Sequence, residues 1–218
     1  MSDTSNLATD LSTASVSDAL DSLGLPGSLH GIGALRQGQR TVGPVFTVTY
    51  EPVDETGGTV GDFLDDVPTG AVILIDNAGR TDCTVWGGIM SQTAHERGIA
   101  GTVINGACRD VAIATAAGYP IWSASRFMRT GKDRVRVAAV QTPVTIDGVL
   151  IRPDDILVAD DDGAVVVPAA HWDQVAHVAR RIDRLEEAIV AAVRGGATLA
   201  EARAQHGYHL LQTRKDPS

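Results

Sequence analysis

AVILIDNAGRTDCTVWGGIMSQTAHERGIAGTVINGACRDVAIATAAGYPIWSAS, residues 71–125, alternates short apolar runs with segments of helical periodicity. Short apolar runs bounded by glycine or turn residues predict strands that are buried on both faces. The expected strands are residues 71–76, 99–104 and 119–125. The expected helices are residues 90–97 and 110–117, which end at Gly98 and Gly118. Strand–helix–strand alternation is typical of a parallel sheet with helices packed on it, so the sequence predicts an α/β core.

One further helix is expected upstream of this core, at residues 13–23. Its apolar residues recur at helical spacing and form one stripe. Ser12 or Thr13 can cap its first turn, and Gly24 ends it.

A strand and a short helix are expected between that first helix and the core. Residues 41–50 form the strand, and Pro44 indicates either its start or a sheet edge, because proline donates no ladder hydrogen bond. Residues 59–66 form the short helix. Residues 1–11 are mostly polar and are expected to be a flexible N-terminus.

The chain after the core predicts antiparallel hairpins. Apolar residues 143–146 and 149–151 flank Asp147–Gly148, a dipeptide that favours a type I′ turn. A second acidic turn separates residues 156–159 from residues 164–167. Two hairpins are therefore expected to follow the parallel part.

The C-terminal part predicts two helices, at residues 169–194 and from Thr198 to about residue 205, separated by Gly195–Gly196. The long helix is polar over most of its surface. We therefore expect one α/β domain at residues 12–168, and C-terminal helices at residues 169–212 that pack on the domain or on a neighbouring subunit.

Composition excludes several classes of protein. The 218 residues include 18 Lys and Arg against 27 Asp and Glu, a net charge of −9 that repels phosphate backbones and argues against nucleic acid. The two cysteines are too few for a disulfide scaffold. No secretory signal or apolar run of membrane-spanning length is evident. A cytoplasmic protein without a membrane partner is expected.

The segment from Gly87 to Asp110 is the candidate site. Gly87 and Gly88 precede a helix start, whose free backbone N–H groups can bind a carboxylate or phosphate. A loop at residues 105–110 follows a strand at its carboxyl end, where open α/β sheets bind ligands. Arg109 can hold a carboxylate through two parallel hydrogen bonds, and Asp110 can bind Mg²⁺.

Structural roles for the same residues remain open. Asp110 can simply cap the helix that follows it, and Arg109 can be a solvated surface charge. Gly87 and Gly88 can form a turn with no ligand.

Several blocks of the chain together resemble the RraA-like family. These blocks are STASVSDALDSLGLPG (residues 12–27), TVGPVFTV (41–48), RGIAGTVINGACRD (97–110), GYPIW (118–122) and PDDILVADDDGAVVVP (153–168). The family includes class II 4-hydroxy-4-methyl-2-oxoglutarate/4-carboxy-4-hydroxy-2-oxoadipate aldolases and the regulator of ribonuclease activity A. The resemblance implies a swivelling β/β/α fold, assembled as a homotrimer or a dimer of trimers with sites between subunits.

The resemblance also implies specific roles in the site. Arg109 would bind the 2-oxo acid and stabilise the developing enolate, and Asp110 would bind Mg²⁺ or Mn²⁺. Backbone N–H groups at Ile89 and Met90 would hold the substrate carboxylate, beside Gly87 and Gly88. The implied activity is divalent-metal-dependent C–C cleavage of a small 2-oxo acid to pyruvate through a metal-stabilised enolate.

Gly88 departs from the aldolase pattern, which has an acidic residue at this position. Aldol cleavage requires a base for the 4-hydroxyl group, whereas decarboxylation does not. Oxaloacetate decarboxylation is therefore expected to persist where aldol cleavage is weak.

Five other features have a functional and a plainer interpretation. Asp82 can enter the site or form a turn, and His95 is expected at the surface. Asp160–Asp162 can bind Ca²⁺ or form a hairpin turn, and it lacks the spacing of a calcium loop. Glu186 or Glu187 can reach a neighbouring subunit's metal, as in the family, or lie on a solvated face. Cys108 is expected to be a small buried residue.

Two functions from different classes follow. The first is the metal-dependent aldolase or decarboxylase described above. The alternative is a non-catalytic protein like the regulator of ribonuclease activity, acting through its surface. A methyltransferase is disfavoured because no Gly-rich nucleotide loop follows the first strand.

Overall fold

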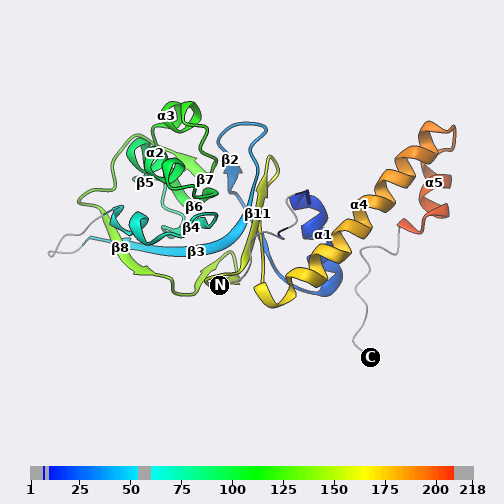
Figure 1. Cartoon of the computed structure of the whole chain (residues 1–218), viewed down its shortest axis with the longest axis horizontal. Helices are drawn as coiled ribbons and strands as arrows, with labels where there is room; N and C mark the ends of the chain where they lie inside the picture. Colours follow the sequence, from blue (N-terminus) through cyan, green and yellow to red (C-terminus); the bar gives the residue numbers. More distant parts are fainter. Residues whose placement is uncertain (1–6, 8–9, 54–59, 209–218) are drawn as a thin grey trace.

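The computed structural model describes residues 7, 10–53 and 60–208 (Figure 1). Its strands are β1 Ser28–Leu29, β2 Gly33–Ala34, β3 Thr41–Pro52, β4 Val72–Asp76, β5 Thr84–Trp86, β6 Gly101–Cys108, β7 Ile121–Arg126, β8 Val135–Val140, β9 Val144–Ile146, β10 Val149–Ile151, β11 Ile156–Asp160 and β12 Gly163–Val167. Its helices are α1 Thr13–Leu23, α2 Gly88–Glu96, α3 Val111–Ala116, α4 Trp172–Arg194 and α5 Leu199–Gln205, with 3₁₀ turns η2 Asp62–Asp66 and η3 Ala169–His171.

One curved sheet organises the molecule, in the order β1–β12–β11–β3–β4–β6–β7–β2. Pairing is parallel from β3 through β4 and β6 to β7, as the alternating sequence pattern predicts. Strands β11, β12, β1 and β2 join this parallel part by antiparallel pairing. The prediction of an α/β fold with hairpins after the core and a helical C-terminal part is confirmed.

The apolar run of β4 is buried on both faces of the sheet. Ile73 and Ile75 join a cluster beneath α2, α3 and η2. Val72 and Leu74 join a second cluster, which the curved sheet and the β9–β10 hairpin enclose. All four side chains are fully buried. The parallel strands are therefore fixed from both sides, and the loops at their carboxyl ends rest on a rigid base.

Strand β6 is longer than the sequence predicts. It continues to Cys108 after a register shift between Ile104 and Ala107, where Gly106 has a φ of 158°. The prediction of a loop at residues 105–110 is therefore wrong, because only Arg109 and Asp110 lie between β6 and α3. This continuation delivers both residues from a rigid strand.

The prediction that Pro44 marks a sheet edge or the start of its strand is also wrong. Strand β3 begins at Thr41 and lies between β11 and β4. Pro44 is paired with Ile156 on β11, and pairing with β4 begins only at Val45. The Val45 N–H donates to the Asp155 carbonyl oxygen on the β11 side. The missing donor of Pro44 therefore falls on the β4 side, just before that ladder starts.

Local signals predict α1 and the first hairpin correctly. The Ser12 hydroxyl accepts a hydrogen bond from the Ser15 N–H at 3.0 Å, and Gly24 closes α1 with a φ of 70°. Asp147 and Gly148 have φ values of 50° and 80°, as a type I′ turn requires. These elements depend on short-range chemistry that is visible in the sequence.

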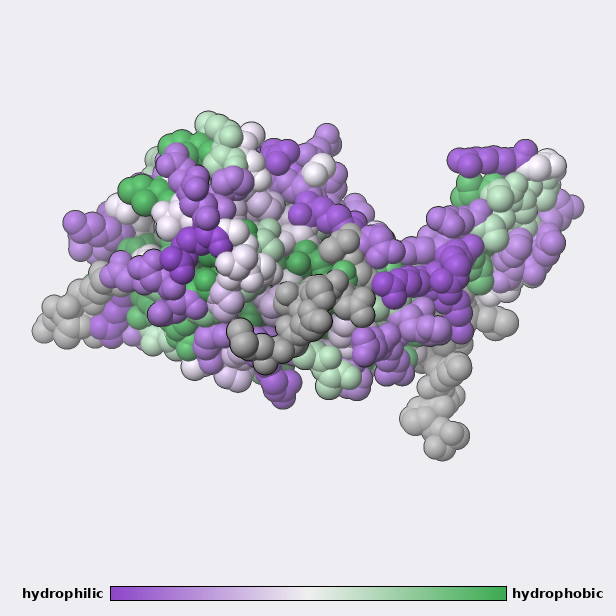
Figure 2. Space-filling view, in the orientation of Figure 1, coloured by the Kyte–Doolittle hydropathy of each residue, from purple (hydrophilic) through white to green (hydrophobic). Residues whose placement is uncertain are grey.

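Helix α4 has two environments along its length. Its first half packs on α1, β11 and β12 through Val175, Ala179 and Ile182. Its distal half carries α5 and projects away from the sheet (Figure 1). Green patches interrupt the purple surface of this arm in Figure 2, and Val190, Val193 and Leu199 are exposed there. Among the described helices, none is long and apolar enough to cross a bilayer.

Some expected segments fall partly outside the described residues. Of residues 59–66, only Asp62–Asp66 forms a helix, of the 3₁₀ type, and residue 59 is not described. Most of the N-terminal segment 1–11 is not described either, but Leu11 is fully buried against α1 and α4. Residues 209–212 also lie outside, so the proposed division into domains remains a prediction.

Candidate active site

The candidate site lies where β5 leads into α2 and β6 leads into α3, at the corner where these helices meet (Figure 1). Gly87 occupies the N-cap position of α2 in an extended conformation and, as glycine, has no side chain that could cap this helix. The Gly88 N–H donates a hydrogen bond to Asp110 Oδ2 at 2.8 Å. The first turn of α2 therefore presents backbone donors to the space in front of it.

Asp110 has an unusual backbone conformation that aims its carboxylate away from its own helix. Its φ of 59° lies in the left-handed region, which is uncommon for residues other than glycine. It occupies the N-cap position of α3, but its side chain makes no capping bond there. The carboxylate binds the start of α2 instead, so Asp110 is more than a helix cap.

Arg109 is held beside this carboxylate. The Arg109 N–H donates to the Trp86 carbonyl oxygen at 3.0 Å, which ties the end of β6 to β5. Arg109 Nε lies 3.6 Å from Asp110 Oδ2. Both side chains are 39% exposed, so neither charge is buried and both remain open to a ligand.

Both glycines lie close to the side chains of neighbouring residues. A Cβ on Gly87 would lie 3.0 Å from Asp110 Oδ2 and 3.3 Å from Arg109 Nε. A Cβ on Gly88 would lie 2.8 Å from Ile113 Cδ1 and 3.3 Å from Asp110 Cβ. The sequence analysis explained these glycines by the approach of a ligand to the backbone. The structure adds a second reason, which is the close packing of Asp110, Arg109 and Ile113 against them.

A buried network fixes the peptide between the glycines. The Trp86 indole N–H donates to Ser91 Oγ at 3.0 Å, and Ser91 Oγ donates to the Gly87 carbonyl oxygen at 3.0 Å. Trp86 also stacks on Tyr119, with ring centroids 6.0 Å apart. Ser91 and Trp86 are almost completely buried, so the peptide that carries the Gly88 N–H has one orientation.

These groups line a cavity of about 460 Å³. It contains every residue that the sequence assigned to the site. Its lining residues are Val60, Gly61, Thr84, Val85, Trp86, Gly87, Gly88, Ile89, Met90, Arg109, Asp110, Thr130 and Lys132. Most of the wall is apolar, and the charged side chains are Arg109, Asp110 and Lys132. The balance favours an anionic ligand with one cation-binding carboxylate beside it.

Thr130 and Lys132 are among the lining residues that sequence reasoning missed, and Lys132 is the charged one. They come from the connection between β7 and β8, and no spacing motif links them to Arg109 or Asp110. Thr130 forms an isolated bridge with Thr84, which places this connection against β5. Only the tertiary arrangement brings Lys132 to the cavity.

The residues around Asp110 suit one type of metal ion. Among the described residues, no group of three or more His, Cys, Asp or Glu side chains is placed to share an ion. Mg²⁺ commonly binds one or two carboxylates and keeps several waters. The single, partly exposed carboxylate of Asp110 fits an ion held largely by water and ligand oxygens, and it does not fit a fully protein-ligated site.

The sequence's secondary candidates lie outside this cavity. Asp82 pairs with Arg80 at 2.9 Å, and that guanidinium lowers the pKa of the Asp82 carboxyl. His95 is exposed on α2. Cys108 is buried, and burial raises the pKa of its thiol, so it is an unreactive core residue.

The acidic turn at Asp160–Asp162 has a structural role. Asp160 accepts hydrogen bonds from the Thr13 N–H at 2.8 Å and from the Thr13 hydroxyl at 2.6 Å. Asp161 accepts one from the Gly38 N–H at 2.8 Å. The turn therefore anchors α1 and a neighbouring loop to the β11–β12 hairpin, which agrees with the plainer interpretation.

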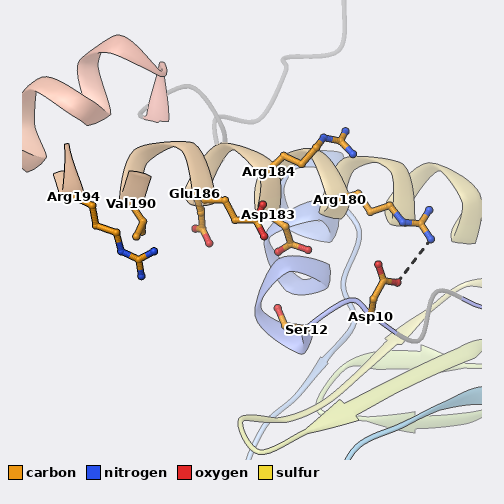
Figure 3. A pocket seen from close by; sticks show the side chains of 9 residues that line it. Asp10, Ser12, Arg180, Asp183, Arg184, Glu186, Val190 and Arg194 are labelled. Carbon is orange, nitrogen blue, oxygen red and sulfur yellow. Dashed lines mark ion pairs between the residues drawn. The ribbon is translucent and has the colours of Figure 1, made fainter. Parts of the chain in front are cut away.

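Glu186 and Glu187 line a different hollow, a groove of about 860 Å³ beside α1 and α4 (Figure 3). Figure 1 shows α4 on the other side of β11 from α2 and α3. Within one chain these glutamates thus lie away from the Asp110 carboxylate. A role in a neighbouring subunit's site remains a prediction.

Comparison with known proteins agrees with this fold. The Aldolase/RraA family model matches residues 13–166, which contain the whole α/β part and both Arg109 and Asp110. The chain belongs to this family. A protein from Halalkalibacterium halodurans named "Putative 4-hydroxy-4-methyl-2-oxoglutarate aldolase" is 33% identical to it over 178 residues, which cover 81% of each chain.

Protein DlpA of Legionella pneumophila is 40% identical to this chain over 199 residues. The match covers 90% of this chain but only 32% of DlpA, so the chain spans about a third of that relative.

Two solved structures share the fold. An uncharacterized protein from Pseudomonas syringae pv. tomato is 46% identical, with a TM-score of 0.86 and 90% of each chain covered. RraAS2 of Streptomyces coelicolor, described as an unusual member of the RNase ES inhibitor RraA protein family, is 30% identical, with a TM-score of 0.76. That match covers 85% of this chain and 94% of RraAS2.

Proposed function

We propose that this chain is a divalent-metal-dependent C–C lyase that cleaves a 2-oxo acid to pyruvate. The carrying observation is the convergence of Arg109, the Asp110 carboxylate and the start of α2 on one cavity. Relatives named as aldolases support the broad class of reaction. Substrate and metal are parts of the proposal.

Arg109 and the first turn of α2 would bind the 2-oxo acid. The guanidinium can hold a carboxylate through two parallel hydrogen bonds, and the N–H groups of Ile89 and Met90 point from the helix start. Both C–C cleavage reactions leave the enolate of pyruvate. Donors fixed in advance stabilise such developing negative charge most effectively in a cavity with apolar walls.

Asp110 would hold Mg²⁺ or Mn²⁺. When bound, such an ion supplies Lewis-acid withdrawal of charge from the 2-oxo group. The Gly88 N–H and Arg109 orient the carboxylate from two sides. The left-handed backbone of Asp110 keeps it pointing at the cavity instead of at α3.

Gly88 makes oxaloacetate decarboxylation the favoured reaction. Aldol cleavage needs a group that accepts the proton of the 4-hydroxyl, and residue 88 has no side chain to position one. Ile113 fills the space that a side chain at this position would need. Loss of CO₂ needs no such proton acceptor.

Pyruvate release from two substrates tests the proposal. Oxaloacetate and 4-hydroxy-4-methyl-2-oxoglutarate would each be assayed with Mg²⁺ and with EDTA, and the metal-only rate in solution would be subtracted. We expect Mg²⁺-dependent turnover that is faster with oxaloacetate. Absence of turnover with both substrates would contradict the proposal.

The second candidate is a regulator that binds a ribonuclease. The likeness to RraAS2 favours it, because that protein is described as a member of a ribonuclease-inhibitor family. It needs no cavity with a fixed Arg–Asp pair. Ribonuclease inhibition by a variant that lacks Arg109 and Asp110, together with no pyruvate release by the intact protein, would favour this alternative.

The proposal also includes an assembly and a compartment. We expect a homotrimer or a dimer of trimers in the cytoplasm, without nucleic-acid or membrane partners. Sedimentation of the purified protein measures the assembly directly.

A further inference from the structure

The connection between β7 and β8 is built tightly against the cavity wall. A Cβ on Gly131 would lie 2.3 Å from the Thr84 carbonyl oxygen and 2.9 Å from Val135 Cγ2, so only glycine fits. The Thr84 N–H donates to the Arg129 carbonyl oxygen at 3.0 Å. This segment therefore has a fixed position on β5.

The turn that carries Lys132 is braced by its own hydrogen bonds. The N–H groups of Arg134 and Val135 both donate to the Gly131 carbonyl oxygen at 2.9 Å. The Arg134 guanidinium donates to the carbonyl oxygens of Thr130 and Lys132 at 3.2 Å. The Lys132 backbone is thus held in place while its side chain remains exposed.

Lys132 brings a second positive charge to the cavity. Among the described residues its ammonium group has no hydrogen-bond or ion-pair partner, although it lines the same cavity as Arg109 and Asp110. Arg109 enters from the end of β6, and Lys132 enters from the β7–β8 connection. The cavity thus has two cationic side chains on separate parts of its wall.

We propose that Lys132 determines substrate specificity by binding the second carboxylate of a dicarboxylic 2-oxo acid. The inference rests on the proposed function, in which Arg109 and the α2 start bind the 2-oxo carboxylate. A compact ammonium on a flexible chain suits a carboxylate whose position varies between substrates. A monocarboxylic 2-oxo acid would leave this charge without a partner.

The proposed contact has a particular kinetic consequence. In oxaloacetate the second carboxylate is the group that leaves as CO₂, so its negative charge disappears as the bond breaks. An ion pair with Lys132 is therefore stronger in the bound substrate than in the transition state. Such a contact lowers KM without raising kcat.

Binding of two unreactive ligands separates this inference from the proposed function. 2-Oxoglutarate and 2-oxopentanoate have equal chain length and differ in a terminal carboxylate against a methyl group. Calorimetry with the Mg²⁺-loaded full chain should show about three- to tenfold tighter binding of 2-oxoglutarate, the range of an exposed to partly shielded ion pair.

Lys132→Met should remove this preference while binding of 2-oxopentanoate stays unchanged, and Lys132→Arg should retain it. Arg129→Met is the matched control, since it removes a positive charge from the same segment without lining the cavity. The control should keep the preference. Thermal melting of each variant checks that the fold is intact.

Oxaloacetate turnover supplies the second readout. Lys132→Met should raise KM about three- to tenfold and leave kcat the same or higher. Equal binding of both ligands by the wild type, or an unchanged preference in Lys132→Met, would overturn the assignment and leave the proposed function standing. Binding of neither ligand would overturn both.

Discussion

Two hollows of the molecule, the groove beside α1 and α4 and the cavity at α2, differ in how their polar groups are held. The groove beside α1 and α4 is the larger, at about 860 Å³, and it is lined by four acidic residues and three arginines on exposed helical surface. The cavity at α2 has about 460 Å³ and only three charged residues. Its backbone donors are set by buried Trp86 and Ser91, whereas Figure 3 shows most of the groove's side chains on the surface of α4, opposite Asp10 and Ser12.

This contrast shows that the volume of a hollow does not by itself identify a candidate active site. In the groove, Arg180 lies 4.0 Å from Asp10, and Ser15 donates a hydrogen bond to Asp183. The groove thus carries charges of both signs in nearly equal number, four acidic residues against three arginines. In the cavity, Arg109 and Lys132 outnumber the one carboxylate, so an anionic ligand is needed to balance the site.

Among the variants that compare the cavity with the groove, Arg109→Ala should cause the largest loss of pyruvate-release activity. Removing a fixed donor to a developing anion typically costs about 10²- to 10³-fold in rate. We expect that loss in kcat/KM for pyruvate release, with Arg109→Lys intermediate because lysine cannot bind a carboxylate in two parallel bonds. An Arg184→Ala variant in the groove is the control, and equal rates in both variants would contradict the assignment.

Gly87→Ala should have a smaller effect on rate. Its Cβ would press on Asp110 Oδ2 and Arg109 Nε and displace both by a few tenths of an ångström. Because catalysis is sensitive to such displacements, we expect about a tenfold loss of kcat/KM with little change in melting temperature.

Gly33→Ala is the matched control for that experiment. No atom lies within 4 Å of the position its Cβ would take, and its φ is not positive. Its activity should match that of the wild type. A Gly87→Ala enzyme with full activity would show that the Arg–Asp geometry is not required.

Glu186→Gln in the groove should have the smallest effect. Partial burial, with Asp18 and Asp183 nearby, raises the pKa of Glu186 in the folded state. The charged form therefore lowers the free energy of unfolding at neutral pH, and this penalty disappears as the pH falls below the usual glutamate value of about 4.3.

The variant should be more stable than wild type at pH 7, within about 0.5 kcal/mol, and equal to it near pH 4. Urea unfolding at both pH values measures the difference. Pyruvate release should stay within about twofold, as expected for a surface substitution away from the site. A large loss of activity would place this glutamate in a neighbouring subunit's site.

Elements with local signals were predictable from the sequence. Ser12 and Gly24 bound α1, and the Asp147–Gly148 turn follows from residue chemistry alone. The extension of β6 past Gly106 and the interior place of Pro44 were not predictable. Both depend on which strand lies beside them, and no short sequence pattern records that.

The sequence also predicted the candidate site only in part. Arg109 and Asp110 follow a strand end, so their neighbourhood could be inferred. The left-handed backbone of Asp110, the packing of Ile113 against Gly88 and the arrival of Lys132 depend on contacts between distant segments. These contacts set the charge balance of the cavity and support the proposed reaction preference, and they required the structure.

Oxaloacetate turnover by Asp110→Asn is the most direct test of a metal-dependent lyase at this cavity. Asparagine keeps the size of the side chain but loses the charge that would bind Mg²⁺. The Mg²⁺-dependent rate of pyruvate release should fall at least about 100-fold below that of the wild type, to the level of wild type in EDTA. Retention of the wild-type rate and metal dependence by Asp110→Asn would contradict the account.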